Sequence, residues 1–122
     1  MEIILDTNFL LEIVKRRIDF SYLEEFGKLV IPKQVLSELE EIAEKNKGKE
    51  KENANLTLQI IEKNKDKFHI IDLKKGFVDK GIVEHAEKNK VLIATIDKNL
   101  KRELKGKSRI LAIKAGKKLE LI

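Results

Sequence analysis

The sequence contains no cysteine and no tryptophan, and it has only one proline, one tyrosine and five phenylalanines. Without cysteine the chain can form no disulfide, no cysteine-ligated zinc site and no thiol nucleophile. No apolar run approaches the ~20 residues of a membrane-spanning helix. The first residues lack a basic region and reach a charge at Glu2, unlike a signal peptide. These absences exclude a disulfide-rich or membrane-spanning protein, and we expect a cytoplasmic one.

Charge is abundant instead. Charged residues make up 39% of the 122 residues, against about 25% in an average soluble domain. Lys and Arg number 26 against 21 Asp and Glu, so the formal net charge is +5. The 42% hydrophobic content is enough for a core. We therefore predict one mildly basic domain over residues 1–122.

Short apolar runs alternate with segments of helical periodicity. The runs predict strands at 2–5, 29–31, 68–71, 91–94 and 110–113. Helical spacing of apolar residues covers 8–17, 32–43, 51–65, 79–89 and 98–105, with the charged stretch 45–53 as an exposed turn. Uninterrupted apolar runs are typical of parallel strands buried on both faces. The alternation predicts a three-layer α/β/α domain whose mostly parallel sheet has four or five strands.

Two acids follow the ends of predicted strands, Asp6 directly and Asp97 after Thr95 and Ile96. Asp6 comes after the first strand, and Asp97 follows the fourth. Ligands of open α/β sheets bind at the carboxyl ends of parallel strands, which meet at one edge. A single Asp there is a common helix N-cap. Two such acids on one edge indicate a site.

Helical-wheel positions add two further acids. With 100° per residue, Asp79 falls within the apolar arc of its helix, and Glu38 borders the apolar stripe of the preceding one. A helix cap for Asp79 and a surface role for Glu38 remain open. If the four carboxylates converge, they repel one another unless a divalent cation lies among them. Oxygen ligands without cysteine or paired histidine favour Mg²⁺ or Mn²⁺, which suit phosphodiester hydrolysis.

These acids lie in motifs that resemble those of the PIN-domain ribonucleases. Residues 3–11, Ile-Ile-Leu-Asp-Thr-Asn-Phe-Leu-Leu, are similar to the family's opening: an apolar strand, Asp, Thr or Ser, Asn and an apolar helix. Residues 31–39 resemble its second block, 78–86 its third and 94–100 its fourth, in which Thr precedes Asp by two residues. All four motifs occur in order over nearly the whole chain.

The resemblance implies a Mg²⁺- or Mn²⁺-dependent endoribonuclease with strand order 3-2-1-4-5. It implies that the catalytic metal ligands are Asp6, Glu38, Asp79 and Asp97, supported by hydrogen bonds from Thr7, Asn8 and Thr95. Many members carry a second acid just after the third or fourth one, where this chain has Lys80 and Asn99. The implied partners are RNA, a second copy in a homodimer and, for a toxin nuclease of the VapC type, a small antitoxin protein. A ribosomal-RNA-processing nuclease is the other role within the family.

A basic stripe is predicted on the last helix. Its four cations, Lys98, Lys101, Arg102 and Lys105, lie opposite the apolar pair Leu100 and Leu104 and begin directly after Asp97. This placement suits RNA phosphates, and a solvated face of a Lys-rich helix explains it equally well. Lys114, Lys117 and Lys118 extend the stripe in the RNA-binding interpretation. The phenylalanines at 9, 20, 26, 68 and 77 are interpreted mainly as core, so no base-stacking surface is expected.

Two rival functions remain. A phosphoacceptor receiver domain has a similar length, and Asp6, Asp72, Thr95 and Lys114 mimic its key residues. The chain lacks that domain's adjacent acids after the first strand, which argues against it. A PIN fold that only binds RNA or protein in ribosome assembly is the other rival, and retention of four acids argues against it. His69 and His85 lack a second ligand at metal-binding spacing, so we expect both to be packed or solvated.

Overall fold

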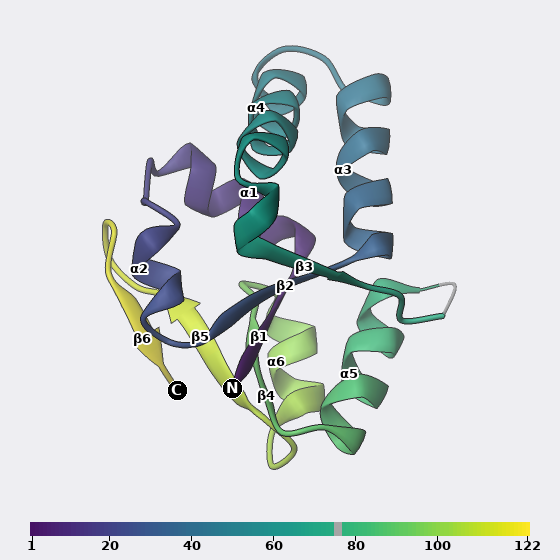
Figure 1. Ribbon diagram of the computed structural model, residues 1–122, viewed down its shortest axis with the longest axis vertical. Coiled ribbons are helices and arrows are strands. Elements are labelled where there is room, and N and C mark those ends of the chain that lie inside the picture. The colour runs from purple at the N-terminus through teal and green to yellow at the C-terminus, as the bar shows by residue number, and fades with distance from the viewer. Residues whose placement is uncertain (75–76) are drawn as a thin grey trace.

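A computed structural model describes residues 1–74 and 77–122 (Figure 1). In chain order the elements are β1 (Glu2–Leu5), α1 (Thr7–Lys15), α2 (Ser21–Glu24), β2 (Lys28–Pro32), α3 (Lys33–Lys45), α4 (Lys49–Lys63), the 3-10 turn η1 (Lys65–Lys67), β3 (Phe68–Ile71), α5 (Val78–Lys88), β4 (Val91–Ala94), α6 (Lys98–Leu104), β5 (Arg109–Ile113) and β6 (Leu119–Leu121). Every predicted strand and helix is present: β1, β3 and β4 have the predicted bounds, and the other predicted elements have shifted ends.

The strands form one sheet in the order β3-β2-β1-β4-β5-β6. β1 pairs in parallel with β2 and β4, and β3 and β5 extend the parallel sheet on either side. The predicted fold class and the order 3-2-1-4-5 are confirmed. The sequence pattern missed β6, which pairs antiparallel with β5 at the sheet edge. With three partly exposed residues, β6 is too short to give a recognisable alternation.

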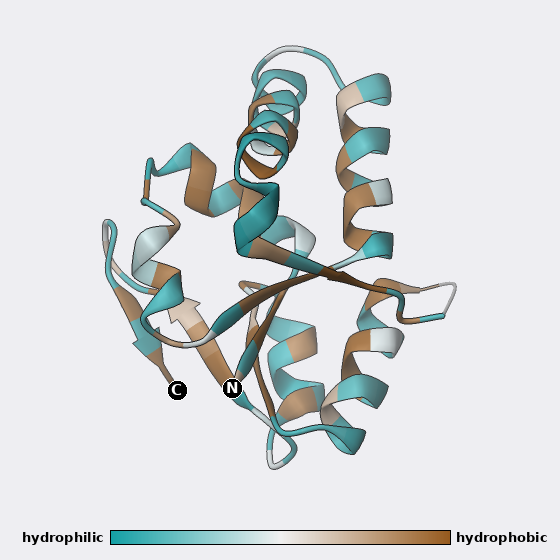
Figure 2. Ribbon diagram, viewed as in Figure 1, coloured by the Kyte–Doolittle hydropathy of each residue, from teal (hydrophilic) through white to brown (hydrophobic). Residues whose placement is uncertain are grey.

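Two apolar cores lie on opposite faces of the sheet. Along β1, Ile3 and Leu5 point to the face that α1, α2, α3 and α4 cover, whereas Ile4 points to the face under α5 and α6. This period of two is the side-chain alternation of a strand. Figure 2 shows apolar strands between helices that carry one apolar side each. The sheet is therefore buried on both faces, as its uninterrupted apolar strands predict.

The charged turn between α3 and α4 is shorter than predicted. Helix α4 already begins at Lys49, so most of the stretch 45–53 is helical. Gly48 occupies the N-cap with φ of 67°, a left-handed conformation that favours glycine. Glu50 and Glu52 then lie in the first turn of α4, where the helix dipole favours negative charge. The left-handed glycine and the favourable charges of the first turn thus allow a helix to form where the composition predicts a long solvated loop.

The prediction that all five phenylalanines are core is wrong for one of them. Phe9 and Phe68 are buried, and Phe20 and Phe26 pack against the same core. Phe20 also meets Phe68 edge to face, with ring centroids 5.4 Å apart. Phe77 is instead 71% exposed. It immediately precedes α5, outside that helix's apolar repeat, so the repeat gives it no core position.

Candidate active site

Asp6 lies at the carboxyl end of β1 and is almost fully buried, with 5% exposure. Its backbone N–H donates to the carbonyl of Ala94, which extends the β1–β4 pairing by one residue. The carboxylate Oδ1 accepts from Thr7 N–H at 2.9 Å as the N-cap of α1. Oδ2 accepts from the Thr95 hydroxyl at 2.8 Å. Both oxygens are thus oriented by neighbouring strand ends.

Thr7, which binds Asp6, also binds Glu38. The Thr7 hydroxyl donates to Glu38 Oε1 at 3.1 Å, while the Thr7 N–H is bound to Asp6. Glu38 lies on α3 one turn after Val35, which is buried in the core, and it is itself half-buried. The hydrogen bonds predicted for Thr7 and Thr95 are therefore present. Both threonines are buried, which fixes the directions of their hydroxyl groups.

Asp97 serves as the N-cap of α6. Its Oδ1 accepts from the N–H groups of Asn99 at 2.8 Å and Leu100 at 3.1 Å. Its own N–H donates to the Thr95 hydroxyl at 3.1 Å. Thr95 thus links Asp6 to Asp97. Capping uses one carboxylate oxygen, so a structural role and a role in the site are compatible for this acid.

Mutual repulsion connects all four acids. Burial raises the pKa of Asp6 to about 6, and the charges of Asp79 and Glu38 contribute in the same direction. Burial, followed by the charge of Asp79, raises the pKa of Glu38. The pKa of Asp79 is raised by burial and then by Asp97 and Glu103, although this residue is largely exposed to solvent. The four predicted residues thus lie near one another at one edge of the sheet.

The acids surround an open edge and do not enclose a common point. Within the described part of the chain, no three His, Cys, Asp or Glu side chains form a group that could hold a metal ion. Like charges favour such spacing when no cation lies among them. The donor chemistry nevertheless fits a hard divalent cation, because the clustered groups are carboxylates, whose negative charges repel one another, together with neutral threonine hydroxyls. The predicted ligand set is therefore still a hypothesis.

A cavity of about 490 Å³ opens beside these acids. Its lining residues come from α3 and the start of α5: Gln34, Ser37, Glu38, Glu41, Phe77, Val78 and Asp79. Glu41 is exposed, and its carboxylate accepts from Lys45 at 2.7 Å. Glu103 also approaches the site, because its charge acts on Asp79. It lies one helical turn after Asn99 on α6, a spacing that could have identified it.

Asp72 and Leu73, just after β3, are held by Gln34, which was not among the predicted site residues. The Gln34 amide donates to Asp72 Oδ1 at 2.8 Å and accepts from the N–H of Leu73 at 3.2 Å. Asp72 also accepts from the N–H of Lys74, and these contacts lower its pKa. Gln34 lies one turn before Glu38 on α3. It thereby ties the helix that carries Glu38 to the segment that leads to Asp79.

Gly81 fits α5 against this segment and gives a stability prediction. A Cβ at position 81 would lie 2.9 Å from Leu73 Cβ, closer than such atoms pack. Alanine normally stabilises a helix interior by about 1 kcal/mol relative to glycine. We expect Gly81→Ala instead to lower the free energy of unfolding by about 1–2 kcal/mol through this overlap. Urea denaturation measures the change, and Lys88→Ala on the exposed side of α5 is the control. A stabilised Gly81→Ala variant would contradict the packing argument.

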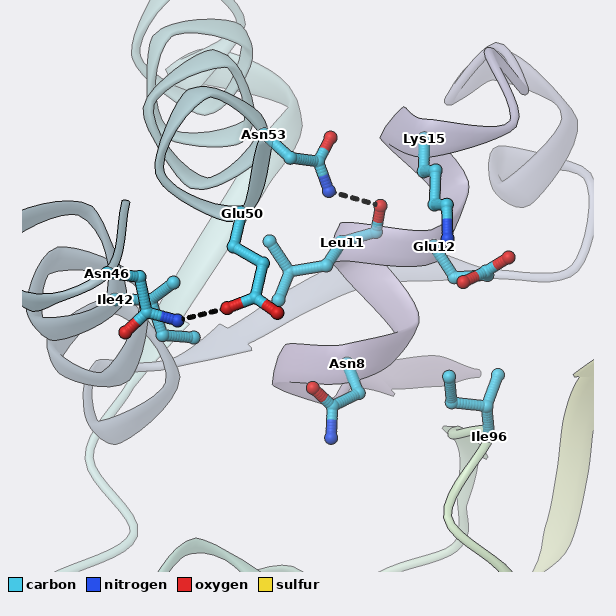
Figure 3. Close-up of a pocket in the computed structure, with 9 residues that line it drawn as sticks. All are labelled: Asn8, Leu11, Glu12, Lys15, Ile42, Asn46, Glu50, Asn53 and Ile96. Atoms are coloured by element: carbon cyan, nitrogen blue, oxygen red, sulfur yellow. Dashed lines mark hydrogen bonds between the residues drawn. The ribbon is translucent and has the colours of Figure 1, made fainter. Parts of the chain in front are cut away.

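A second cavity, of about 330 Å³, lies beside the first turn of α1 (Figure 3). Helices α1, α3 and α4 and the β4–α6 connection supply its lining: Asn8, Leu11, Glu12, Lys15, Ile42, Asn46, Glu50, Asn53 and Ile96. Asn53 donates to the carbonyl of Leu11 at 2.9 Å across the cavity. The exposed Asn8, predicted to support the acids, thus lines this neighbouring space.

The predicted basic stripe lies on the outer side of α6. Leu100 and Leu104 are buried, as the pattern predicts. Lys98, Lys101, Arg102 and Lys105 line a shallow depression of about 600 Å³ together with Gly106, Ser108, Ile110 and Ile122. The stripe starts at the residue after Asp97. Lys114, Lys117 and Lys118 are exposed near the turn that follows β5.

The raised pKa of Asp6 predicts a pH-dependent stability in the absence of divalent metal. Between pH 4 and 6 the folded state keeps a proton that the unfolded state has released, so stability falls as pH rises. The difference from the ordinary value of 3.8 corresponds to at most about 3 kcal/mol above pH 6. Asp6→Asn should therefore equal the wild type in stability near pH 4 and exceed it near pH 7. Denaturation in chelator across this range measures the difference, and a pH-independent difference would contradict the assignment.

The parallel sheet and its acid-lined carboxyl edge define an α/β protein with a strand-end site. The sequence profile of a family described as "PIN like domain" matches residues 3–115. The chain belongs to this family. Ribonuclease VapC4 of Methanocaldococcus jannaschii is 34% identical over 111 residues, which cover 84% of this chain and 82% of that protein. Ribonuclease VapC9 of Archaeoglobus fulgidus is 32% identical over 105 residues, which cover 84% and 74%.

The receiver-domain alternative is wrong, because the family match spans nearly the whole chain. Asp72, the residue that mimics a phosphoacceptor, instead binds Gln34. His69 is exposed on β3, and His85 is half-buried on α5. No helix in residues 1–74 and 77–122 has the length and apolar character needed to cross a bilayer.

Proposed function

We propose that this chain is a divalent-metal-dependent endoribonuclease of the toxin type. The observation that carries the proposal is the buried Asp6, whose oxygens are oriented by Thr7 and Thr95 and whose pKa is raised by burial and by Asp79 and Glu38. A site that leaves such charges uncompensated is suited to a cation. The two relatives named as VapC ribonucleases support RNA as the substrate.

The residues that would hold Mg²⁺ or Mn²⁺ are Asp6, Glu38, Asp79 and Asp97. The cation, when bound, acidifies a water molecule and neutralises charge on the scissile phosphate. Mg²⁺ usually keeps several waters and takes one or two carboxylates directly, so some of these acids act through water. Thr7 and Thr95 keep the Asp6 and Glu38 carboxylates in place as their charges are neutralised.

The chain's own groups then bind and orient the RNA. In hydrolysis, a water oxygen bonds to phosphorus, the bond to one ribose oxygen breaks, and that oxygen takes up a proton. The cations of α6, from Lys98 to Lys105, flank the acids and bind the phosphates on either side of the break. The acid edge alone would repel RNA, so the stripe supplies the attraction.

Removal of divalent metal tests the proposal directly. We expect the purified chain to cleave structured RNA with Mg²⁺ or Mn²⁺, to lose cleavage in excess chelator, and to recover it when either ion is restored. Initial rates on a labelled RNA measure the effect, and the circular dichroism spectrum in chelator controls for unfolding. Full cleavage in excess chelator would refute metal dependence.

The similarity to VapC proteins favours a toxin role over ribosomal-RNA processing. A toxin nuclease is controlled by a small antitoxin protein, which we propose as a partner, with a second copy of the chain in a homodimer. An isologous homodimer interface should bury more than about 1,000 Å². Light scattering gives the mass. A monomer at high protein concentration would contradict the homodimer and leave the nuclease proposal standing.

A further inference from the structure

Phe77 is an exposed aromatic ring beside the acids. It is 71% exposed, whereas the other four phenylalanines pack in or against the core. A single exposed apolar side chain is common on protein surfaces, so exposure alone carries no conclusion. Its location does, because Phe77 lines the same cavity as Glu38 and Asp79 and lies two residues before Asp79. A nucleotide whose phosphate reaches the acids therefore brings a base within range of this ring.

A lysine lies against the same ring. Lys80 Nζ is 5.6 Å from the Phe77 ring centroid, in the range of a cation–π contact. The pair thus combines an aromatic face with a positive charge, next to the acidic cavity that Phe77 lines. A nucleobase fits the first, and a phosphate fits the second.

We propose that Phe77 stacks on one unpaired base next to the scissile phosphate and that Lys80 binds the adjacent phosphate. This inference rests on the proposed ribonuclease function. Base stacking on a side chain requires the base to leave its neighbours, which a single-stranded loop allows and a duplex resists. The contact therefore needs an unpaired base next to the broken bond, with little dependence on which base occupies the ring.

Kinetics of ring variants test the contact. Stacking of one base on an aromatic side chain is worth a factor of about 5 to 150 in binding. We expect Phe77→Ala to raise KM for a single-stranded RNA by about tenfold while kcat changes little, and Phe77→Trp to restore KM. Tyr22→Ala, which removes another exposed ring outside the cavity, should leave KM unchanged. Unchanged KM in Phe77→Ala would overturn the inference without affecting the nuclease assignment.

An abasic scan isolates the stacked base and does not depend on cleavage. Single nucleotides of the RNA are replaced by abasic residues, and affinity is measured by fluorescence anisotropy with Asp6→Asn chains to prevent cleavage. At one position the abasic change should weaken binding about tenfold when Phe77 is present and have no effect with Phe77→Ala. Additive losses would show that the base and the ring do not interact. A coupled loss of binding, together with a wild type that cleaves no RNA in the presence of Mg²⁺ or Mn²⁺, would sustain the base contact and refute the nuclease.

Protein association is the competing role for an exposed ring. Light scattering of the wild type and of Phe77→Ala separates the two. An unchanged mass together with the raised KM supports base stacking. A fall in mass, with KM restored at high protein concentration, would mean that the ring joins two copies of the chain and would overturn the inference.

Discussion

Asp6→Asn should reduce RNA cleavage by more than about 100-fold. Loss of groups that only orient metal ligands commonly costs 10–100-fold, so loss of a proposed direct ligand should exceed that range. Asparagine keeps the shape of the side chain and caps helices as well as aspartate does. The asparagine oxygen can still accept from the Thr7 N–H, and the Thr95 hydroxyl can turn to accept from the new amide NH2, so the fold is preserved. Initial cleavage rates at saturating Mg²⁺ or Mn²⁺ measure the loss.

The control for this variant is Asp19→Asn. Asp19 likewise accepts a hydrogen bond from a backbone N–H, that of Ser21 at 2.9 Å, but lies outside the cavities beside the acids. The cleavage rate of Asp19→Asn should equal that of the wild type. Asp97→Asn should lose cleavage as Asp6→Asn does, and titration calorimetry should show weaker Mn²⁺ binding in both. Near-normal cleavage by Asp6→Asn with intact structure would remove Asp6 from the site.

The paired substitution Lys101→Glu with Arg102→Glu should weaken RNA binding by about 10- to 100-fold at moderate salt. Each phosphate contact to a single strand contributes about 0.7 to the slope of log affinity against log salt. Loss of two contacts should reduce that slope by about 1.4, and the new carboxylates add repulsion. Binding curves at several salt concentrations give both quantities, and Mn²⁺ affinity should not change.

A matched charge reversal separates a local track from net charge. Lys51→Glu with Lys63→Glu changes the net charge equally but lies on exposed positions of α4, across the sheet from α6. This pair should reduce RNA affinity much less. Equal losses for the two pairs would mean that α6 has no special role and that its stripe is solvated surface.

Strand-end acids were predictable because their positions follow from the parallel sheet. Asp6 comes directly after β1 and Asp97 three residues after the end of β4, and adjacent parallel strands bring them together. Asp79 and Glu38 could be placed only by a helical wheel. A wheel gives the direction of a side chain around the helix axis, and it does not give how deeply that side chain is buried. Asp79 lies in the first turn of α5 and lines the open cavity, so it is more exposed than its position in the apolar arc of the helical wheel suggests.

The roles of Gln34 and Phe77 could not be predicted from periodicity. Gln34 acts through a side-chain amide that binds a segment 38 and 39 residues away, and no local pattern specifies that pairing. Phe77 has the composition of a core residue but lies outside the apolar repeat of α5. Long-range polar contacts and residues at helix ends depend on tertiary geometry, which single-sequence patterns do not contain.

The two sides of the site are anchored differently, and they should therefore open on different timescales. The amide of Asp6 is bonded to Ala94 within the central strands, so its hydrogen exchanges only when the core unfolds. The amide of Leu73 is bonded to the Gln34 side chain, which a single rotamer change can release. The Asp6 side of the site should therefore open only when the whole domain unfolds, whereas the Leu73 side can open by a local fluctuation. Hydrogen exchange should therefore be faster at Leu73 than at Asp6, without any rearrangement of the sheet that holds Asp6.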